Sequence, residues 1–136
     1  MSTIKDFRDI EAWKKARILC SDIYEISNKT DLSKDYSLKD QIRRSSGSIM
    51  DNIAEGFERD GRKEFIYFLS IAKGSCGEVV SQLYRTFDQK YIDKEQFDEL
   101  LDKSTEVGKM IGSFMNYLKN SEYKGKKFKT PELETN

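Results

Sequence analysis

The chain has 136 residues, enough for one domain with its own hydrophobic core. Its 24 lysines and arginines balance 24 aspartates and glutamates, so net charge does not indicate a nucleic-acid-binding protein, and the absence of histidine removes the commonest general base and metal ligand. The sequence shows no secretory signal and no apolar run near the roughly 20 residues of a membrane span, and its two cysteines lie in helical patterns typical of buried thiols, so we expect a cytoplasmic protein.

The first predicted helix covers residues 9–28. Asp9 is the expected N-cap, because a side-chain oxygen at that position can accept a hydrogen bond from the first turn. Small and apolar residues then recur at steps of three and four, namely Trp13, Ala16, Cys20, Ile23 and Ser27. This spacing predicts one face that packs against a partner helix.

The second predicted helix follows a polar connection at residues 29–37. Ser37 together with Asp40 resembles a capping box and marks its start. Its expected inner face consists of Leu38, Ile42, Ser45 or Ser46, Ile49, Ile53 and Gly56. We expect Gly56 to terminate the helix, because glycine readily adopts the left-handed conformation found at helix ends.

The third predicted helix covers about residues 62–90. Its apolar stripe consists of Phe65, Leu69, Ala72, Cys76, Val79, Leu83 and Phe87. A glycine inside a helix costs about 0.5 to 1 kcal/mol relative to alanine, so Gly74 and Gly77 need a compensating contact. We predict that residues 45–48 pack against residues 74–77; the alternative is that both glycines face water.

The fourth predicted helix begins at Asp93, with Gln96 in the reciprocal capping position. Its stripe has strict spacing of three and four: Phe97, Leu100, Ser104, Val107, Ile111, Phe114 and Leu118. Four amphipathic helices joined by short polar loops predict an all-α fold, an antiparallel up-down-up-down four-helix bundle over residues 1–120. Residues 121–136 are expected to form a disordered, charged C-terminal tail.

The helices carry more apolar residues than one bundle core requires. Those beside the main stripes are Leu19, Ile26, Ile66, Tyr67, Phe68, Ile71, Val80, Tyr84, Leu101, Met110, Met115 and Tyr117. A second apolar face of this kind favours self-association, and a wide buried stripe within one bundle is the alternative.

No motif indicates an enzyme. The serines at positions 45, 46, 48 and 75 have no histidine to activate them, and the di-metal sites of helical bundles use histidine together with glutamate. The four glutamates at positions 55, 58, 64 and 78 mostly fall outside the apolar stripes, which argues against an all-carboxylate metal site. With no strand predicted, no nucleotide-binding loop is expected either. We therefore expect no catalytic, metal or cofactor site and no small-molecule substrate.

Basic residues are the remaining candidates for a binding site. The main cluster is Arg43, Arg44, Arg59, Arg62 and Lys63, in the second helix and the loop after it. Others lie in the first helix and in the tail. Such groups can neutralise phosphates, although interleaved acids make surface ion pairs an alternative explanation. Repetition of a modest basic patch around an oligomer would strengthen its field.

Four segments resemble a known family. Residues 38–56 read LKDQIRRSSGSIMDNIAEG, residues 65–75 read FIYFLSIAKGS, and the opening FRDIEAWKKA at residues 7–16 and IYEI at residues 23–26 fit the same pattern. In these segments the chain resembles the bacterial four-helix bundle proteins encoded in intervening sequences of large-subunit ribosomal RNA genes. The resemblance spans about residues 4–120.

That family is similar in fold to the accessory variability protein of diversity-generating retroelements, a barrel-like pentamer that binds nucleic acid and a reverse transcriptase. The resemblance therefore implies a homo-pentamer, with nucleic acid or a reverse transcriptase as partner. Within the matching motif, Arg43 and Arg44 could face phosphate, and Asn52 and Glu55 could contact a partner. In the structural alternative, Arg44 and Glu55 tie helices or subunits together, Asn52 caps or bridges buried backbone, and Gly56 ends the helix.

Two hypotheses on function follow. The first is a non-enzymatic, oligomeric interaction protein of the intervening-sequence family that binds RNA or DNA weakly through repeated basic patches. The second is a structural or regulatory adaptor that binds another protein and no nucleic acid, as the balanced charge favours.

Overall fold

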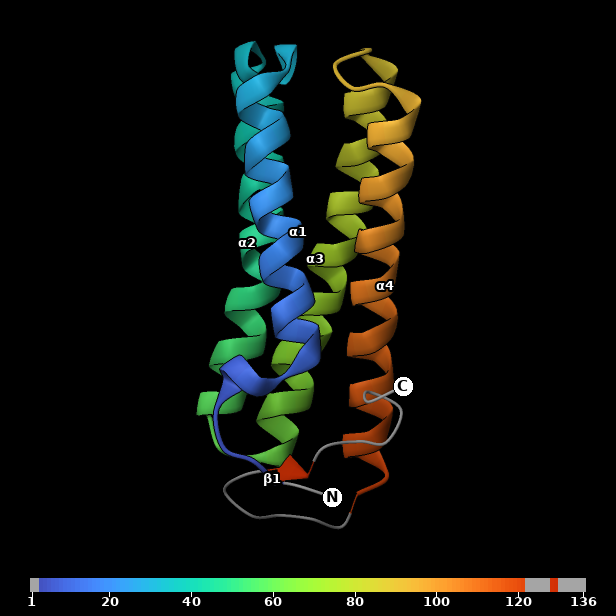
Figure 1. Cartoon of the computed structure of the whole chain (residues 1–136). Helices are drawn as coiled ribbons and strands as arrows, with labels where there is room; N and C mark the ends of the chain where they lie inside the picture. Colours follow the sequence, from blue (N-terminus) through green and yellow to red (C-terminus); the bar gives the residue numbers. More distant parts are fainter. Residues whose placement is uncertain (1–2, 122–127, 130–136) are drawn as a thin grey trace.

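The computed structural model describes residues 3–121 and 128–129. Its long helices are α1 (Glu11–Lys29), α2 (Tyr36–Glu58), α3 (Arg62–Asp88) and α4 (Lys94–Lys119). Each runs opposite to the one before it, and they lie in the order α1, α2, α3, α4 around the bundle, with α4 beside α1 (Figure 1). The predicted all-α up-down-up-down bundle is confirmed.

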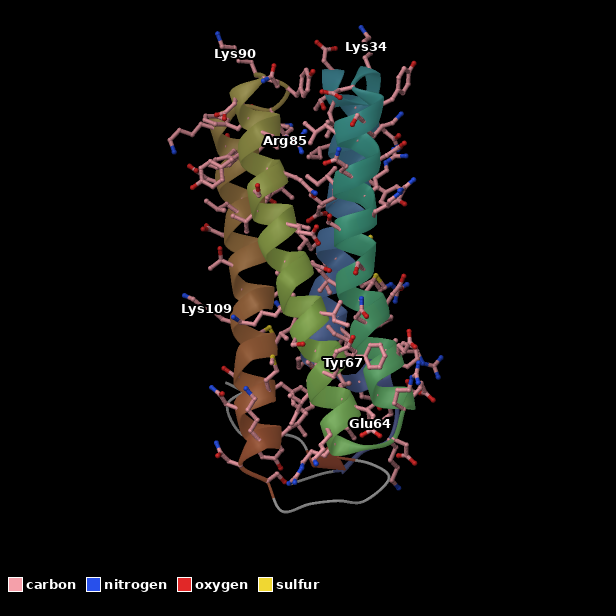
Figure 2. The ribbon with its side chains drawn as sticks, turned by 180° about the vertical axis from the view of Figure 1, so that it is seen from behind. Lys34, Glu64, Tyr67, Arg85, Lys90 and Lys109 are labelled. Carbon is pink, nitrogen blue, oxygen red and sulfur yellow. The ribbon has the colours of Figure 1, made fainter. Side chains whose placement is uncertain are left out.

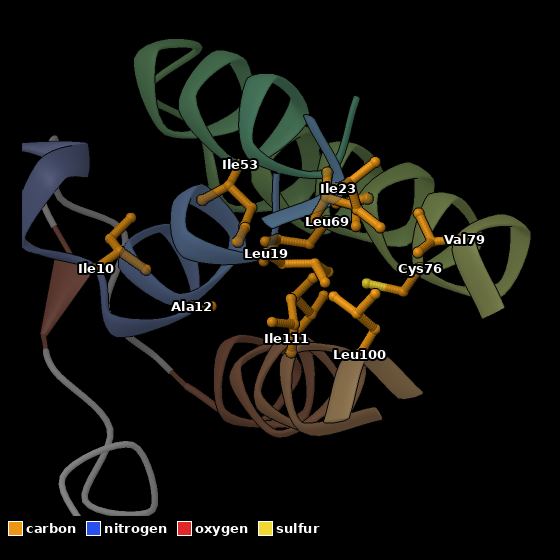
Figure 3. Close-up of a cluster of buried hydrophobic side chains, with 14 of the residues drawn as sticks. Ile10, Ala12, Leu19, Ile23, Ile53, Leu69, Cys76, Val79, Leu100 and Ile111 are labelled. Atoms are coloured by element: carbon orange, nitrogen blue, oxygen red, sulfur yellow. The ribbon is translucent and has the colours of Figure 1, made fainter. Parts of the chain in front are cut away.

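The core lies along the axis between the helices, as the spacing predicted (Figure 3). All seven residues predicted to line the inner face of α4 are buried. The predicted capping box is also present, since Asp93 Oδ1 accepts from Gln96 N at 2.8 Å and Gln96 Oε1 accepts from Asp93 N at 2.9 Å. At one end of the core, the Phe65 ring contacts Phe57 and Phe114 edge to face, with centroids 5.9 and 5.3 Å apart.

The start and the inner face of α1 differ from the prediction. Asp9 is not an N-cap; it lies in a short 3-10 helix, η1 (Phe7–Asp9), and the backbone N of Arg8 donates to Asp6 Oδ1 at 2.8 Å. The buried residues of α1 are Ala12, Ala16, Leu19, Ile23 and Ser27. Trp13 and Cys20 are only partly buried. The Trp13 ring contacts Phe7 of η1, with centroids 5.2 Å apart, and Cys20 Sγ accepts from Ser46 Oγ on α2 at 3.7 Å.

The second helix starts earlier than predicted. The connection contains a 3-10 helix, η2 (Asp31–Lys34), and Asp35 caps α2 by accepting from the backbone N of Leu38 at 3.2 Å. Ser37 is therefore inside the first turn, and the predicted capping box is wrong. An aspartate two residues earlier satisfies the same free backbone donors.

Gly56 is not a helix terminator. It is buried inside α2, which continues to Glu58, and no glycine of the described residues has a positive φ. A Cβ at position 56 would lie 2.7 Å from Phe68 Cβ and 3.0 Å from Phe65 Cδ1. The glycine is required because α3 passes too close for a side chain at this position. The left-handed conformation after the end of α2 is adopted by Asp60 instead, with a φ of 66°.

The predicted contact between the small residues of α2 and α3 forms through serines. Ser48 Oγ and Ser75 Oγ are 2.9 Å apart. The glycines do not take part, because a Cβ at Gly74 or Gly77 would meet nothing within 4 Å. For these two positions the water-facing alternative holds.

A short antiparallel pair joins two distant segments at one end of the bundle. Strand β1 (Thr3–Ile4) pairs with β2 (Phe128–Lys129), with Ile4 opposite Phe128. The expectation that the chain has no strand is wrong here, because two residues are too few for a period-two pattern to be seen. The remainder of the predicted tail, except Ser121, lies outside the described residues.

Candidate nucleic-acid interface

The structure does not bring the predicted basic cluster together on one surface. Arg43 faces α1, where its guanidinium contacts Tyr24, whereas Arg59 lies beside α3 with its guanidinium 5.1 Å from the Phe68 ring. Arg62, the first residue of α3, donates through Nη1 to the backbone O of Ser121, which follows the end of α4. Arg44 and Lys63 are exposed.

The motif residues Asn52 and Glu55 make contacts within their own helix. Asn52 Nδ2 donates to Ser48 O at 2.8 Å and to Ser48 Oγ at 2.9 Å, next to the Ser48 and Ser75 pair. Glu55 Oε2 accepts from Arg59 Nη2 at 2.7 Å. Asn52 thus binds the backbone and the hydroxyl of Ser48, and it is Ser48 that makes the contact to Ser75 on α3.

A different set of cations gathers between α1 and α2. Arg43 Nε donates to Ser27 Oγ and Arg43 Nη2 donates to Asn28 Oδ1, both at 2.7 Å. Its Cζ lies 4.5 Å from the centroid of the Tyr24 ring. These contacts hold the guanidinium plane in one orientation and use two of its five N–H donors, so the others can bind an anion.

Two more cations lie over aromatic rings on the same pair of helices. Arg17 Cζ is 5.8 Å from the centroid of the Trp13 ring, and Lys39 Nζ is 4.8 Å from that of Tyr36. We call this surface the α1/α2 strip, and it consists of Trp13, Arg17, Tyr24, Tyr36, Lys39 and Arg43. Its aromatic rings reach the surface, since Tyr24 is 44% and Tyr36 71% exposed.

Among the described residues, the cations of the strip have no acidic partner. Within the described residues, no carboxylate lies within 4.0 Å of Arg17, Lys39 or Arg43. Lysines 14, 15, 29 and 34, in contrast, each pair with a glutamate or aspartate. The strip is therefore locally positive although the chain is neutral.

Part of this strip could have been predicted from the sequence. An aromatic residue followed by a cation four positions later, as in Trp13 and Arg17, or three positions later, as in Tyr36 and Lys39, lies on one side of a helix. The stacking of Arg43 on Tyr24 joins residues on different helices, and its detection requires the packing of α1 against α2.

Other kinds of site find little support in the described part of the chain. It contains no group of three or more Cys, Asp or Glu side chains arranged to hold a metal ion. None of its helices is long and apolar enough to span a membrane. Burial raises the pKa of the Cys76 thiol to about 12, so this thiol is a poor nucleophile at neutral pH.

Comparison with known proteins agrees with the resemblance noted in the sequence. A model of the family described as 23S rRNA-intervening sequence protein matches residues 8–113. The fold is similar to the crystal structure of a protein of unknown function from the S23 ribosomal protein family of Bacteroides thetaiotaomicron VPI-5482, with 28% sequence identity and a TM-score of 0.70. That match covers 76% of this chain and 97% of the other. No match was found among curated proteins.

Proposed function

This chain belongs to the 23S rRNA-intervening sequence protein family, and we propose that it is a non-enzymatic, cytoplasmic interaction module that binds single-stranded RNA or DNA weakly. In this proposal the α1/α2 strip is the binding surface, and the protein acts as a homo-oligomer that repeats the strip. The observation that carries the proposal is the row of cations that lie on aromatic rings and pair with no carboxylate of the described residues.

The chemistry of the strip suits unpaired nucleotides. Guanidinium groups bind phosphate through parallel N–H donors, and bases stack on aromatic rings or on guanidinium planes. A flat stacked pair such as Arg43 on Tyr24 can offer both contacts to one nucleotide. A duplex hides its base faces, so the strip should prefer single strands and loops.

Self-association would compensate for the small size of one strip. Three cations can neutralise only a few phosphates, which supports weak binding at physiological salt. A closed ring repeats the strip at each copy and raises the overall affinity through multivalency. The resemblance to the accessory variability protein points to five copies, and a reverse transcriptase is the protein partner that this resemblance implies.

Fluorescence anisotropy across a salt series tests the proposal, with labelled single-stranded RNA and DNA, structured RNA and duplex DNA as probes. Light scattering on the same samples gives the mass of the assembly. We expect micromolar binding of single strands that weakens steeply as salt rises. In the variant Arg17→Ala/Lys39→Ala, the slope of log affinity against log salt should fall by about 1 per residue removed.

The matched control is Lys29→Ala/Lys34→Ala, which removes the same charge from residues already paired with Glu25 and Asp31. This control should bind like the wild type. Equal losses of nucleic-acid affinity in both variants would show that binding depends on net charge alone and would rule out the strip as the binding site. No binding at low salt would overturn the nucleic-acid proposal and favour the adaptor, which the balanced charge of 24 against 24 also favours.

A further inference from the structure

A groove of about 610 Å³ runs along the outside of α3 and α4. Much of its lining is small, including Gly77 on α3 and Gly108 and Gly112 on α4. A Cβ at Gly77 would meet nothing within 4 Å, and one at Gly108 would make only an ordinary contact with Cys76 Cβ at 3.8 Å. A Cβ at Gly112 would lie 3.4 Å from Cε of Lys73, the end of a flexible side chain. The groove therefore has room for the backbone of a helix to approach closely.

The charged residues that line this groove are both lysines, Lys73 and Lys109. Neither has a carboxylate within 4.0 Å among the described residues. Figure 2 shows Lys109 on the outer side of α4. The groove thus offers two exposed, unpaired positive charges beside a floor of small residues, a combination that fits an acidic helix with small side chains.

The outer face of α2 carries acidic and small side chains of this kind. Residues at steps of four and three form a stripe that points away from the core, and we call it the acidic stripe: Asp40, Arg44, Gly47, Asp51, Ala54 and Glu58. Its second half, from Gly47 to Glu58, carries two exposed carboxylates, Asp51 and Glu58, and no cation. A Cβ at Gly47 would meet nothing within 4 Å, so no contact in the described part of the chain explains this helical glycine.

We propose that the acidic stripe of α2 in one copy docks into the α3/α4 groove of a second copy. This inference rests on the self-association proposed above and names the two surfaces that make the contact. Asp51 and Glu58 then approach Lys73 and Lys109, and Gly47 and Ala54 face the glycines of the groove. Pairing of two acidic stripes with each other is disfavoured, because like charges would meet.

The contact joins two different surfaces of each copy. The acidic stripe is on α2, and the groove is on the side of the bundle formed by α3 and α4 (Figure 2). After the first contact forms, one copy therefore keeps a free groove and the other keeps a free stripe. Such a heterologous contact propagates and closes into a ring when the rotation between copies allows it.

Charge reversal with light scattering tests the contact. The variants Lys73→Glu/Lys109→Glu and Asp51→Lys/Glu58→Lys each place like charges across it, so each should lose the oligomer and give the mass of one chain. The variant with all four substitutions restores opposite charges in reversed order and should regain the wild-type mass. The control Lys29→Glu/Lys34→Glu, with Lys29 at the end of α1 and Lys34 at the end of η2, should leave the mass unchanged.

Circular dichroism checks that each variant keeps its helices, and recovery in the fourfold variant cannot result from unfolding. A wild-type protein that stays a single chain at every concentration would overturn both the proposed self-association and this contact. If the wild type is oligomeric and both double variants keep its mass, self-association stands and the contact is wrong. The groove would then be open to an acidic helix of another protein.

Discussion

The glycines inside α2 and α3 differ in what a methyl group would meet. A methyl group at Gly56 would overlap with Phe68, whereas one at Gly74 would enter open space. We predict that Gly56→Ala lowers the free energy of unfolding by about 1 to 3 kcal/mol, because α3 must move away. Gly74→Ala should raise it by about 0.5 to 1 kcal/mol through helix propensity alone.

Urea unfolding followed by circular dichroism measures both effects. The two variants make the same chemical change in neighbouring helices, so each serves as the control for the other. If both substitutions change the free energy of unfolding by the same small amount, α2 and α3 lie farther apart at Gly56 than in this structure.

At the scale of the element, the first turn of α2 depends on Asp35. Its Oδ1 accepts from Leu38 N at 3.2 Å, and its Oδ2 accepts from the hydroxyl of Tyr91 at 3.1 Å, in the connection between α3 and α4. Asp35→Ala should lower the free energy of unfolding by about 1 kcal/mol, within the usual range of 0.5 to 2 kcal/mol for a lost cap. Ser37→Ala should have almost no effect, since Ser37 does not cap the helix.

Tyr91 provides a second measurement of the same contact. Its hydrogen bond to Asp35 raises the pKa of the phenol, with further contributions from burial and from the charges of Asp35 and Asp31. The pKa of Tyr91, followed by ultraviolet absorption, should fall toward its ordinary value in Asp35→Ala and stay unchanged in Ser37→Ala. An unchanged pKa in both variants would contradict the contact.

At the scale of the whole molecule, the two cysteines report on the packing of the bundle. Cys76 is 4% exposed and lies in the core, whereas Cys20 is partly exposed between α1 and α2. At pH 8 a thiol reagent should therefore modify Cys20 in the folded protein and Cys76 only after unfolding. A Cys20→Ser variant should show no fast reaction, and rapid modification of its Cys76 would mean that the core opens locally.

The direction of the pKa shift at Cys76 also sets a pH dependence. Burial raises its pKa from 9.0 in the unfolded chain to about 12, so the folded state holds the proton more tightly. This contribution to stability is fully present below pH 9 and is lost as the pH rises toward 12. The slow reaction of Cys76 should thus persist throughout the neutral range.

The amino-acid sequence by itself determined the four helices, the inner faces of α2 and α4, and the family. Spacing of three and four along α4 predicted every buried residue of that helix, because a helix of 3.6 residues per turn places those positions on one side. The capping box of Asp93 and Gln96 was predictable because it is local. The prediction was wrong where two nearby residues could both cap a helix, because Asp35 and not Ser37 caps α2.

Only the tertiary structure decided which surface residues come together. Helical spacing places Arg43 on the outside of α2, but the packing of α1 against α2 brings it onto Tyr24 and separates it from Arg59. The role of Gly56 depends on how closely α3 passes, and the pairing of β1 with β2 joins residues more than a hundred positions apart. Each of these contacts is set by the distance between elements, which no local pattern of residues encodes.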